Sequence, residues 1–291
     1  MLKKVKNLIS NNIEIDDSIK KYALIIGENP TMGARSPLLW NVAFKKHKIS
    51  CKMYPADVNK NNFKKLIREL YRDKKFLAAA ITNPYKETIY QMLKKQSSSL
   101  AKEIQSGNCL YRKQNKFFLT NTDAEASFFA LKKKFKLKKE NTILIMGFGG
   151  VGKAVASSFN HYMGKNSKIY IATRKKILRK KNYFNFISWK EISNVLKKVT
   201  ICINCTSVGF RVKNRSPLTI KQISKFKTDT ILYDVIYNPK KTYFLRLGER
   251  EKLKTINGFN MNFTQAVLGF NIANNLKTKS ITIKAMKEIL S

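Results

Sequence analysis

The stretch Asn141 to Phe159 reads NTILIMGFGGVGKAVASSF, and it predicts a strand, a glycine-rich turn and a helix in succession. Thr142–Met146 is a short apolar run bounded by polar residues, which is typical of a buried strand. Glycines follow in G-x-G-x-x-G spacing, and Lys153–Phe159 is expected to be helical. This order is typical of a dinucleotide-binding turn, although a glycine turn without a ligand is the alternative. The cofactor-binding candidates here are Gly147, Gly149, Gly150 and Gly152.

The end of the next expected strand, Lys168–Ala172, bears on the choice of dinucleotide. An NAD site usually has an acidic residue there, which binds the ribose 2′-hydroxyl. The chain instead continues with Thr173, Arg174 and Lys175. A cationic end suits the 2′-phosphate of NADP, and a guanidinium can hold a phosphate through a forked contact. A solvated basic loop is the alternative.

The chain has 291 residues, 43% of them hydrophobic, which suffices for two globular domains. Its formal net charge is +40, from 58 Lys and Arg against 18 Asp and Glu. Such a charge would ordinarily indicate a nucleic-acid or membrane partner. The cations are spread along the whole chain, without a basic tail or a nucleic-acid-binding motif. We therefore expect a compositional bias and no specific nucleic-acid partner.

The cysteines are scattered and form no disulfide framework, which fits a reducing cytoplasm. Cys202 and Cys205 lie in a strand-like run, where positions three apart point to opposite faces. We therefore expect no metal site and no redox pair there. The amino terminus has no long apolar segment, so no signal peptide is expected, and no stretch is long enough to span a membrane. These features predict a cytoplasmic protein without a membrane partner.

Alternating strands and helices predict an α/β fold with two α/β domains. Residues 1–122 would form a substrate-binding domain with a mostly parallel sheet, beginning with a polar extension of about 20 residues. Residues 123–257 would form a Rossmann dinucleotide-binding domain. Two helices in residues 258–291 would pack back on the first domain. The expected strands are 22–27, 52–57, 76–82, 142–146, 168–172, 200–204 and 231–235.

Two helix starts carry candidate functional residues. Ser36 followed by Pro37 is expected to cap one helix. If Asn83 caps the next, Lys86 occupies its third position, where the helix dipole disfavours a cation and so favours proton transfer. A plain surface lysine is the alternative. Asp123 is expected in the first turn of a further helix, where an acid needs no functional reason.

An ordered series of motifs connects these residues. They are GENPTMGARSP, ITNPYKE, SGNCL, TNTD, GFGGVG, ATRKK, NCTSVGF, DVIYNP and NGFNMNFTQA. In this series the chain resembles the shikimate dehydrogenase family from about residue 22 to residue 275. The resemblance implies NADP-dependent reduction of 3-dehydroshikimate to shikimate, a step towards chorismate and the aromatic amino acids. It implies a small-molecule substrate, and we expect a monomer or a homodimer without a metal.

The resemblance also implies residue roles. Lys86 matches the catalytic lysine and Asp123 its aspartate partner, and both also contact the substrate. The remaining substrate-binding matches are Ser36, Thr82, Asn108, Tyr237 and Gln265. The remaining cofactor-binding matches are Asn204, Thr206 and Ser207 in a loop that faces the cofactor, and Gly258 and Met261 at the nicotinamide pocket.

The chain departs from the family pattern at Ala34, where the family usually has serine, and at Ala80, where it usually has asparagine. These departures leave the substrate less certain than the reaction class. One alternative is a quinate or related cyclic polyol-acid dehydrogenase that uses NAD or NADP. A second is a non-catalytic relative that binds anions or nucleic acid.

Overall fold

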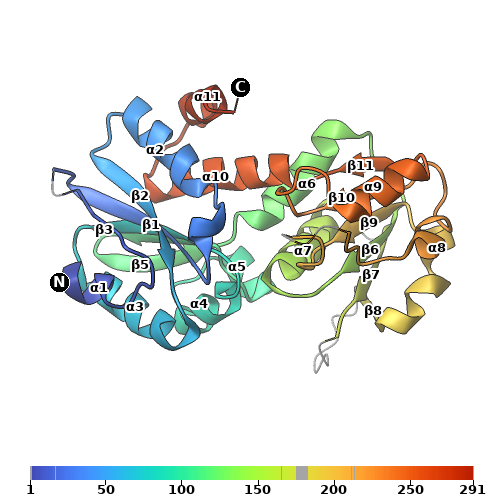
Figure 1. Cartoon of the computed structure of the whole chain (residues 1–291), viewed down its shortest axis with the longest axis horizontal. Helices are drawn as coiled ribbons and strands as arrows, with labels where there is room; N and C mark the ends of the chain where they lie inside the picture. The colour runs from blue at the N-terminus through green and yellow to red at the C-terminus, as the bar shows by residue number, and fades with distance from the viewer. Residues whose placement is uncertain are drawn as a thin grey trace. The chain divides into compact units, whose positions relative to one another are not determined.

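The computed structural model describes residues 2–16, 18–164, 166–174, 183–210, 212 and 214–290. The chain divides into two compact units, each with its own sheet (Figure 1). Unit 1 comprises Met1–Thr122 and Gln265–Ser291, and unit 2 comprises Asp123–Thr264. Strands and helices alternate in both units, so the predicted α/β class is confirmed.

Unit 1 contains a five-stranded sheet in the order β2-β1-β3-β4-β5. Only β4 runs against the other strands, so the sheet is mostly parallel, as predicted. The three parallel strands predicted first are correct to within one residue, whereas the β4–β5 hairpin was not predicted. The strands are β1 Lys21–Gly27, β2 Cys51–Asp57, β3 Phe76–Ile81, β4 Cys109–Lys113 and β5 Lys116–Thr120.

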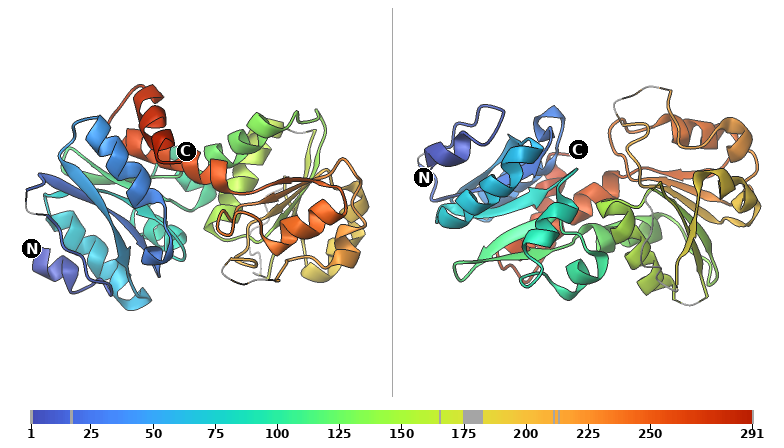
Figure 2. Two further views of the ribbon diagram at one scale, coloured as in Figure 1. Left: turned by 45° about the horizontal axis from the view of Figure 1, so that its top comes forward. Right: turned by 90° about the horizontal axis from the view of Figure 1, so that it is seen from below.

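Helices cover both faces of this sheet (Figure 2). Val5, Phe63 and Ile89, from α1, α3 and α4, pack in one cluster with Leu24 and Ile26 of β1. Helix α2 lies on the opposite face, where Trp40 and Phe44 are buried. The helices are α1 Leu2–Lys6, η1 Pro30–Met32, α2 Ser36–Lys46, α3 Lys60–Arg72, α4 Lys86–Met92, α5 Ser99–Ile104, α11 Ser280–Glu288 and the part of α10 Phe259–Ala273 that follows Thr264.

The amino-terminal segment is not the polar extension that the sequence suggested. Val5 and Ile13 are 0% and 5% exposed and belong to the core of unit 1. Ser10 donates its backbone N–H to the Asp57 carbonyl at 2.7 Å, which ties the segment to the end of β2. Leu8, Ile9 and Ile15 pack against the same core. These apolar residues are interspersed with lysines, asparagines and acids, so the segment reads as polar in sequence, and the prediction was wrong.

The carboxy-terminal helices pack on α2, as predicted (Figure 1). The Phe270 ring in α10 lies 5.5 Å from the Trp40 ring and 4.9 Å from the Phe44 ring, centroid to centroid. The His47 Nε2 lies 2.9 Å from the Thr282 Oγ1 of α11. Aromatic packing and one polar contact therefore attach the end of the chain to unit 1.

Unit 2 contains a six-stranded sheet in the order β11-β10-β9-β6-β7-β8, with every pair parallel. Numbered within the unit, this is the doubly wound order 6-5-4-1-2-3, which changes direction between β6 and β9. The predicted Rossmann arrangement is therefore confirmed. The strands are β6 Thr142–Met146, β7 Lys168–Ala172, β8 Asn185–Ile187, β9 Ile201–Asn204, β10 Ile231–Asp234 and β11 Lys254–Ile256.

Alternate residues of these strands enter two cores. Ile145 packs with α6 and α7, whereas Leu144 packs with η2, η3, α8 and α9. Cys202 belongs to the second core and Cys205 packs against the first, which confirms that they point to opposite faces. The helices of unit 2 are α6 Asp123–Lys134, α7 Gly150–Met163, η2 Trp189–Asn194, η3 Leu196–Lys198, α8 Ile220–Ile223 and α9 Tyr243–Arg250.

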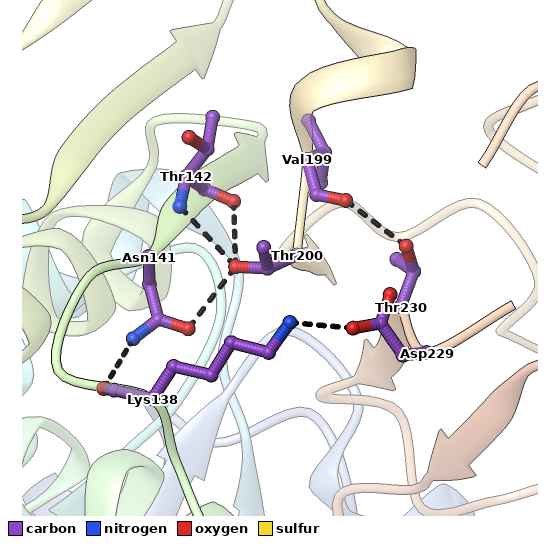
Figure 3. Close-up of polar contacts among 7 residues, drawn as sticks. All are labelled: Lys138, Asn141, Thr142, Val199, Thr200, Asp229 and Thr230. Atoms are coloured by element: carbon purple, nitrogen blue, oxygen red, sulfur yellow. Dashed lines mark hydrogen bonds and ion pairs between the residues drawn. The ribbon is translucent and has the colours of Figure 1, made fainter. Parts of the chain in front are cut away.

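Side chains fasten the amino ends of the central strands of unit 2 (Figure 3). The Thr200 hydroxyl donates to Asn141 Oδ1 at 3.0 Å and accepts from the Thr142 N–H at 3.2 Å. The Thr230 hydroxyl donates to the Val199 carbonyl at 2.9 Å. These contacts connect neighbouring strands at the amino edge of the sheet.

Replacing Phe270 with alanine should lower the free energy of unfolding of unit 1 by about 3–5 kcal/mol, because a fully buried ring is lost. Urea unfolding should be followed by Trp40 fluorescence in a Trp189→Phe background, since these are the only tryptophans. The matched control is Ile272→Ala on the same helix, where the side chain is 37% exposed. Equal losses in the two variants would show that Phe270 does not anchor the helix.

Candidate functional site

The sheet of unit 1 changes direction between β1 and β3, and ligands of open α/β sheets bind at the carboxyl ends of such strands. Gly27 ends β1, and Thr82 directly follows β3. The Thr82 N–H donates to the Ile26 carbonyl at 2.9 Å. A Cβ at position 27 would overlap the Thr82 side chain, so glycine is needed for the two strand ends to approach. The predicted residue Thr82 therefore lies at the crevice of unit 1.

Asn108 and Gln265 meet at this crevice although 157 positions separate them. Asn108 is 4% exposed, and its Oδ1 accepts from the Thr122 N–H at 2.7 Å. That bond fixes the orientation of the amide, so Nδ2 donates to Gln265 Oε1 at 3.3 Å and to Thr122 Oγ1 at 3.0 Å. The Asn108 carbonyl accepts from the Ile81 N–H, which places the pair beside β3. Amide groups can bind hydroxyl groups, since each carries both a donor and an acceptor. In this structure the Asn108 donors face Thr122 and Gln265.

Lys86 lies next to this amide pair. The Gly107 N–H donates to the Lys86 carbonyl at 3.0 Å, so the lysine backbone is fixed one residue from Asn108. The predicted cap at Asn83 is wrong, because Tyr85 precedes the helix and Lys86 is its first residue. The Tyr85 N–H closes a turn onto the Thr82 carbonyl at 3.0 Å, and the helix begins only after that turn. Lys86 is half-buried.

Ser36 is likewise the first helical residue and not the cap, which is Arg35. Its side chain is 3% exposed. Within the described residues, Ser36 makes no side-chain hydrogen bond to Thr82, Asn108 or Gln265, so the structure does not join it to that group.

In unit 2 the glycine motif forms the turn between β6 and α7. Gly147 has φ +95°, a conformation that favours glycine, and a Cβ at Gly152 would overlap the Gly147 carbonyl. A Cβ at Gly149 would meet nothing within 4 Å, so this glycine is not required by packing. Helix α7 begins at Gly150, three residues before the predicted start, and presents the N–H groups of its first turn. Such a helix start can bind a pyrophosphate.

The end of β7 carries the residues predicted to choose the dinucleotide. Thr173 is half-buried and Arg174 is exposed, directly after Ala172. The Gly147 N–H donates to the Ala172 carbonyl at 2.8 Å, so this strand end lies beside the glycine turn. The third predicted residue, Lys175, lies outside the described residues. The exposed Arg174 thus follows a strand end that lies beside the glycine turn.

The loop after β9 lies against the same turn. A Cβ at Gly147 would lie 3.0 Å from the Thr206 Cγ2, so the two segments are in contact. Asn204 is fully buried, and its Oδ1 accepts from the Thr206 N–H at 3.0 Å and from the Thr206 hydroxyl at 2.7 Å. Ser207 is exposed in this loop. The structure thus brings Gly147, Asn204 and Thr206 together, as a cofactor site between β6 and β9 requires.

Asp234, at the end of β10, is a residue that sequence reasoning missed. Its side chain is 0% exposed, and its Oδ1 accepts from Asn204 Nδ2 at 3.1 Å and from the Ile236 N–H at 3.0 Å. Its Oδ2 accepts from the Thr242 hydroxyl at 2.6 Å. Burial raises the pKa of Asp234 to about 6, although these hydrogen bonds oppose the shift. An acidic residue at the end of an apolar strand was the signal available in DVIYNP.

The segment after β10 positions the other predicted residues of unit 2. A Cβ at Gly258 would overlap the Val235 carbonyl, and the Gly258 N–H donates to the Ile236 carbonyl at 3.0 Å. Tyr237 is half-buried in the same segment. Met261 is 5% exposed in the first turn of α10 and packs in the core beside β10. Gly258 is therefore required for α10 to start close to the end of β10.

Asp123 is the first residue of α6 and is 4% exposed. It belongs to the same unit as Tyr233 and Cys205, and its charge helps to raise the pKa of both groups, after the larger effect of burial. A nearly buried carboxylate at a helix start favours a polar or cationic partner and can orient one.

Two negative findings concern the described residues alone. They contain no group of three or more histidine, cysteine, aspartate or glutamate side chains that could hold a metal ion. Within the same residues, none of the helices has the length and apolar character needed to cross a bilayer.

Comparisons with known proteins agree with this architecture. Residues 25–110 match the model described as "Shikimate dehydrogenase substrate binding domain". A relative from Pelagibacter ubique, named "Shikimate dehydrogenase (NADP(+))", is 32% identical over 87% of this chain and 93% of its own. A relative from Clostridium beijerinckii with the same name is 31% identical over 80% and 84%. The crystal structure of shikimate dehydrogenase 1 from Peptoclostridium difficile superposes with a TM-score of 0.80 at 27% identity, covering 92% and 97%.

Two glycine substitutions should separate folding from ligand binding. Gly152→Ala should destabilise unit 2 by about 2 kcal/mol, because the new Cβ would lie 2.1 Å from the Gly147 carbonyl oxygen and the backbone would have to shift. Gly149→Ala should leave the free energy of unfolding within about 1 kcal/mol and weaken dinucleotide binding by about tenfold or more. Chemical denaturation and cofactor titration measure the two effects. Undiminished binding by Gly149→Ala would argue against a pyrophosphate over this turn.

Proposed function

The chain belongs to the shikimate dehydrogenase family, and from that premise we propose that it catalyses the reversible, NADP-dependent reduction of 3-dehydroshikimate to shikimate. The observation that carries the proposal is identity of 31–32% to NADP-dependent relatives over at least 80% of the chain. In the proposed pathway role, the product leads to chorismate and the aromatic amino acids. The protein is thus an oxidoreductase that acts on a CH–OH group.

The groove between β6 and β9 suits NADP. Open space over Gly149, the first-turn N–H groups of α7 and the close contact at Gly152 together fit a pyrophosphate. Arg174 would bind the 2′-phosphate, with Thr173 beside it and Lys175 following in sequence. Asn204, Thr206 and Ser207 would line the nicotinamide half, together with Gly258 and Met261. Bound NADPH supplies the hydride that reduces the carbonyl carbon.

The polar crevice of unit 1 suits a polyhydroxylated acid. Thr82, Asn108 and Gln265 would bind ring hydroxyls, because the oriented amides offer donors and acceptors. Ser36 and Tyr237 would bind the carboxylate and ring hydroxyls.

Lys86 would give a proton to the carbonyl oxygen as the hydride reaches the carbon. In the reverse direction it would take that proton back. Asp123 would orient the lysine and a substrate hydroxyl, because a carboxylate accepts hydrogen bonds from both.

Other proposed properties rest on the sequence. We propose a cytoplasmic monomer or homodimer without a metal or a specific nucleic-acid partner. A quinate or related polyol acid remains the second candidate substrate, because Ala34 stands where the family usually has serine. The charge of +40 should raise the local concentration of the anionic cofactor and of the carboxylate substrate. Added salt should weaken this effect.

Purified protein should form NADPH from shikimate and NADP⁺, and Lys86→Ala should lower kcat by about 10²–10⁴-fold, the usual contribution of a proton-transfer group. NADP⁺ affinity should stay within about twofold, because Lys86 belongs to the unit that lacks the glycine turn. The control is Lys95→Ala, which removes an exposed lysine from the same unit. Full activity in Lys86→Ala would reject the catalytic role of this lysine. Wild-type protein that oxidises quinate but not shikimate would show that the second candidate is the substrate.

Arg174→Gln should raise the KM for NADP⁺ by about 10–100-fold, because it removes hydrogen bonds worth about 1.5–3 kcal/mol to a charged group. The KM for NAD⁺, which lacks the 2′-phosphate, should change less than about threefold. Steady-state kinetics with both cofactors measures the ratio. Lys133→Gln on α6 serves as the charge-matched control. A parallel rise for both cofactors would show that Arg174 does not bind the 2′-phosphate.

A further inference from the structure

Asp234 is fully buried and begins a chain of hydrogen bonds that ends at the glycine turn. Its Oδ1 accepts from Asn204 Nδ2, and the other amide atom, Asn204 Oδ1, accepts from the Thr206 N–H and hydroxyl. Thr206 Oγ1 in turn accepts from the Val208 N–H at 3.1 Å, and the Thr206 methyl group contacts Gly147. The amide of Asn204 can occupy this position in one orientation only, because the carboxylate needs its donor side.

The same carboxylate oxygen also holds the segment after β10. Asp234 Oδ1 accepts from the Ile236 N–H, and the Ile236 carbonyl accepts from the Gly258 N–H at the start of α10. Val235, between them, is in contact with Gly258. One buried oxygen atom therefore sets the loop after β9 and the segment that leads to Tyr237 and α10.

We propose that Asp234 is a positioning residue that fixes the two loops receiving the nicotinamide half of NADP. The inference rests on the proposed NADP-dependent function. In a doubly wound sheet each half binds one mononucleotide, and the change in direction lies between β6 and β9. The adenosine half of the cofactor then lies at the ends of β6 and β7, and the nicotinamide half lies at the ends of β9 and β10. Asp234 connects these last two strand ends through its hydrogen bond with Asn204.

The acceptor oxygen, and not the negative charge, carries this role. Both loop contacts use Oδ1, whereas Oδ2 accepts only from Thr242, the N-cap of α9. An asparagine at 234 can keep its oxygen in the Oδ1 position and donate through its Nδ2 to the Thr242 hydroxyl. An alanine there leaves the Asn204 Nδ2 and the Ile236 N–H without their buried acceptor.

The experiment compares two ligands. NADP⁺ spans both halves of the site, and adenosine 2′,5′-bisphosphate probes the adenosine half alone. Calorimetric titration of Asp234→Ala should show NADP⁺ affinity reduced by about tenfold or more and adenosine 2′,5′-bisphosphate affinity within about twofold of wild type. Asp234→Asn should restore NADP⁺ affinity to within about twofold. Thr242→Val, the control, should lower Tm without a change in NADP⁺ affinity, because it removes a buried hydrogen bond that the loops do not use.

The outcomes separate positioning from general stability. Equal losses for the two ligands in Asp234→Ala, or an NADP⁺ loss in Thr242→Val as large as that in Asp234→Ala, would overturn the inference. If Asp234→Ala does not fold, Asp234→Ser, whose hydroxyl is too short to reach both donors, takes its place with the same expected ratio. Wild-type protein that binds neither ligand would overturn the proposed function, and this inference with it.

Discussion

The contact between Gly152 and the carbonyl of Gly147 is the constraint on which the nucleotide-binding half depends. Any side chain at position 152 would overlap backbone, so only glycine allows α7 to start this close to the end of β6. That closeness directs the first-turn N–H groups to the groove between β6 and β9. Gly27 serves the same purpose in unit 1, where it allows the end of β1 to approach Thr82.

Buried side-chain oxygens then hold what the glycines bring together. Asn108 fixes the amide of Gln265 in unit 1, and Asp234 fixes the amide of Asn204 in unit 2. In each unit one buried polar side chain, an amide in unit 1 and a carboxylate in unit 2, orients a neighbouring amide, because a donor must face an acceptor when water is excluded. Both arrangements lie at the carboxyl edges of the sheets. At the amino edge of unit 2, Thr200 bonds to Asn141 and to the Thr142 backbone.

Local sequence signals account for most of the fold. Continuous apolar runs located the parallel strands, such as Thr142–Met146, to within a residue, because both faces of those strands are buried. The glycine spacing indicated the Rossmann unit. Sequence patterns failed to predict elements that have little hydrophobic periodicity of their own. The β4–β5 hairpin, the short strands β8 and β11 and the docked amino terminus were missed, since pairing or burial against distant segments stabilises them.

For the site, the sequence by itself determined the chemistry available. It supplied a glycine turn, a cationic strand end without an acid, and a set of polar residues in family order. Only the tertiary structure decided how these residues meet. It placed Lys86 at the first helical position, paired Asn108 with Gln265 across 157 positions, and made Asp234 the support of the Asn204 loop. The physical reason is that these contacts depend on which strands lie side by side and which groups lose water, and neither is encoded in any short stretch of the chain.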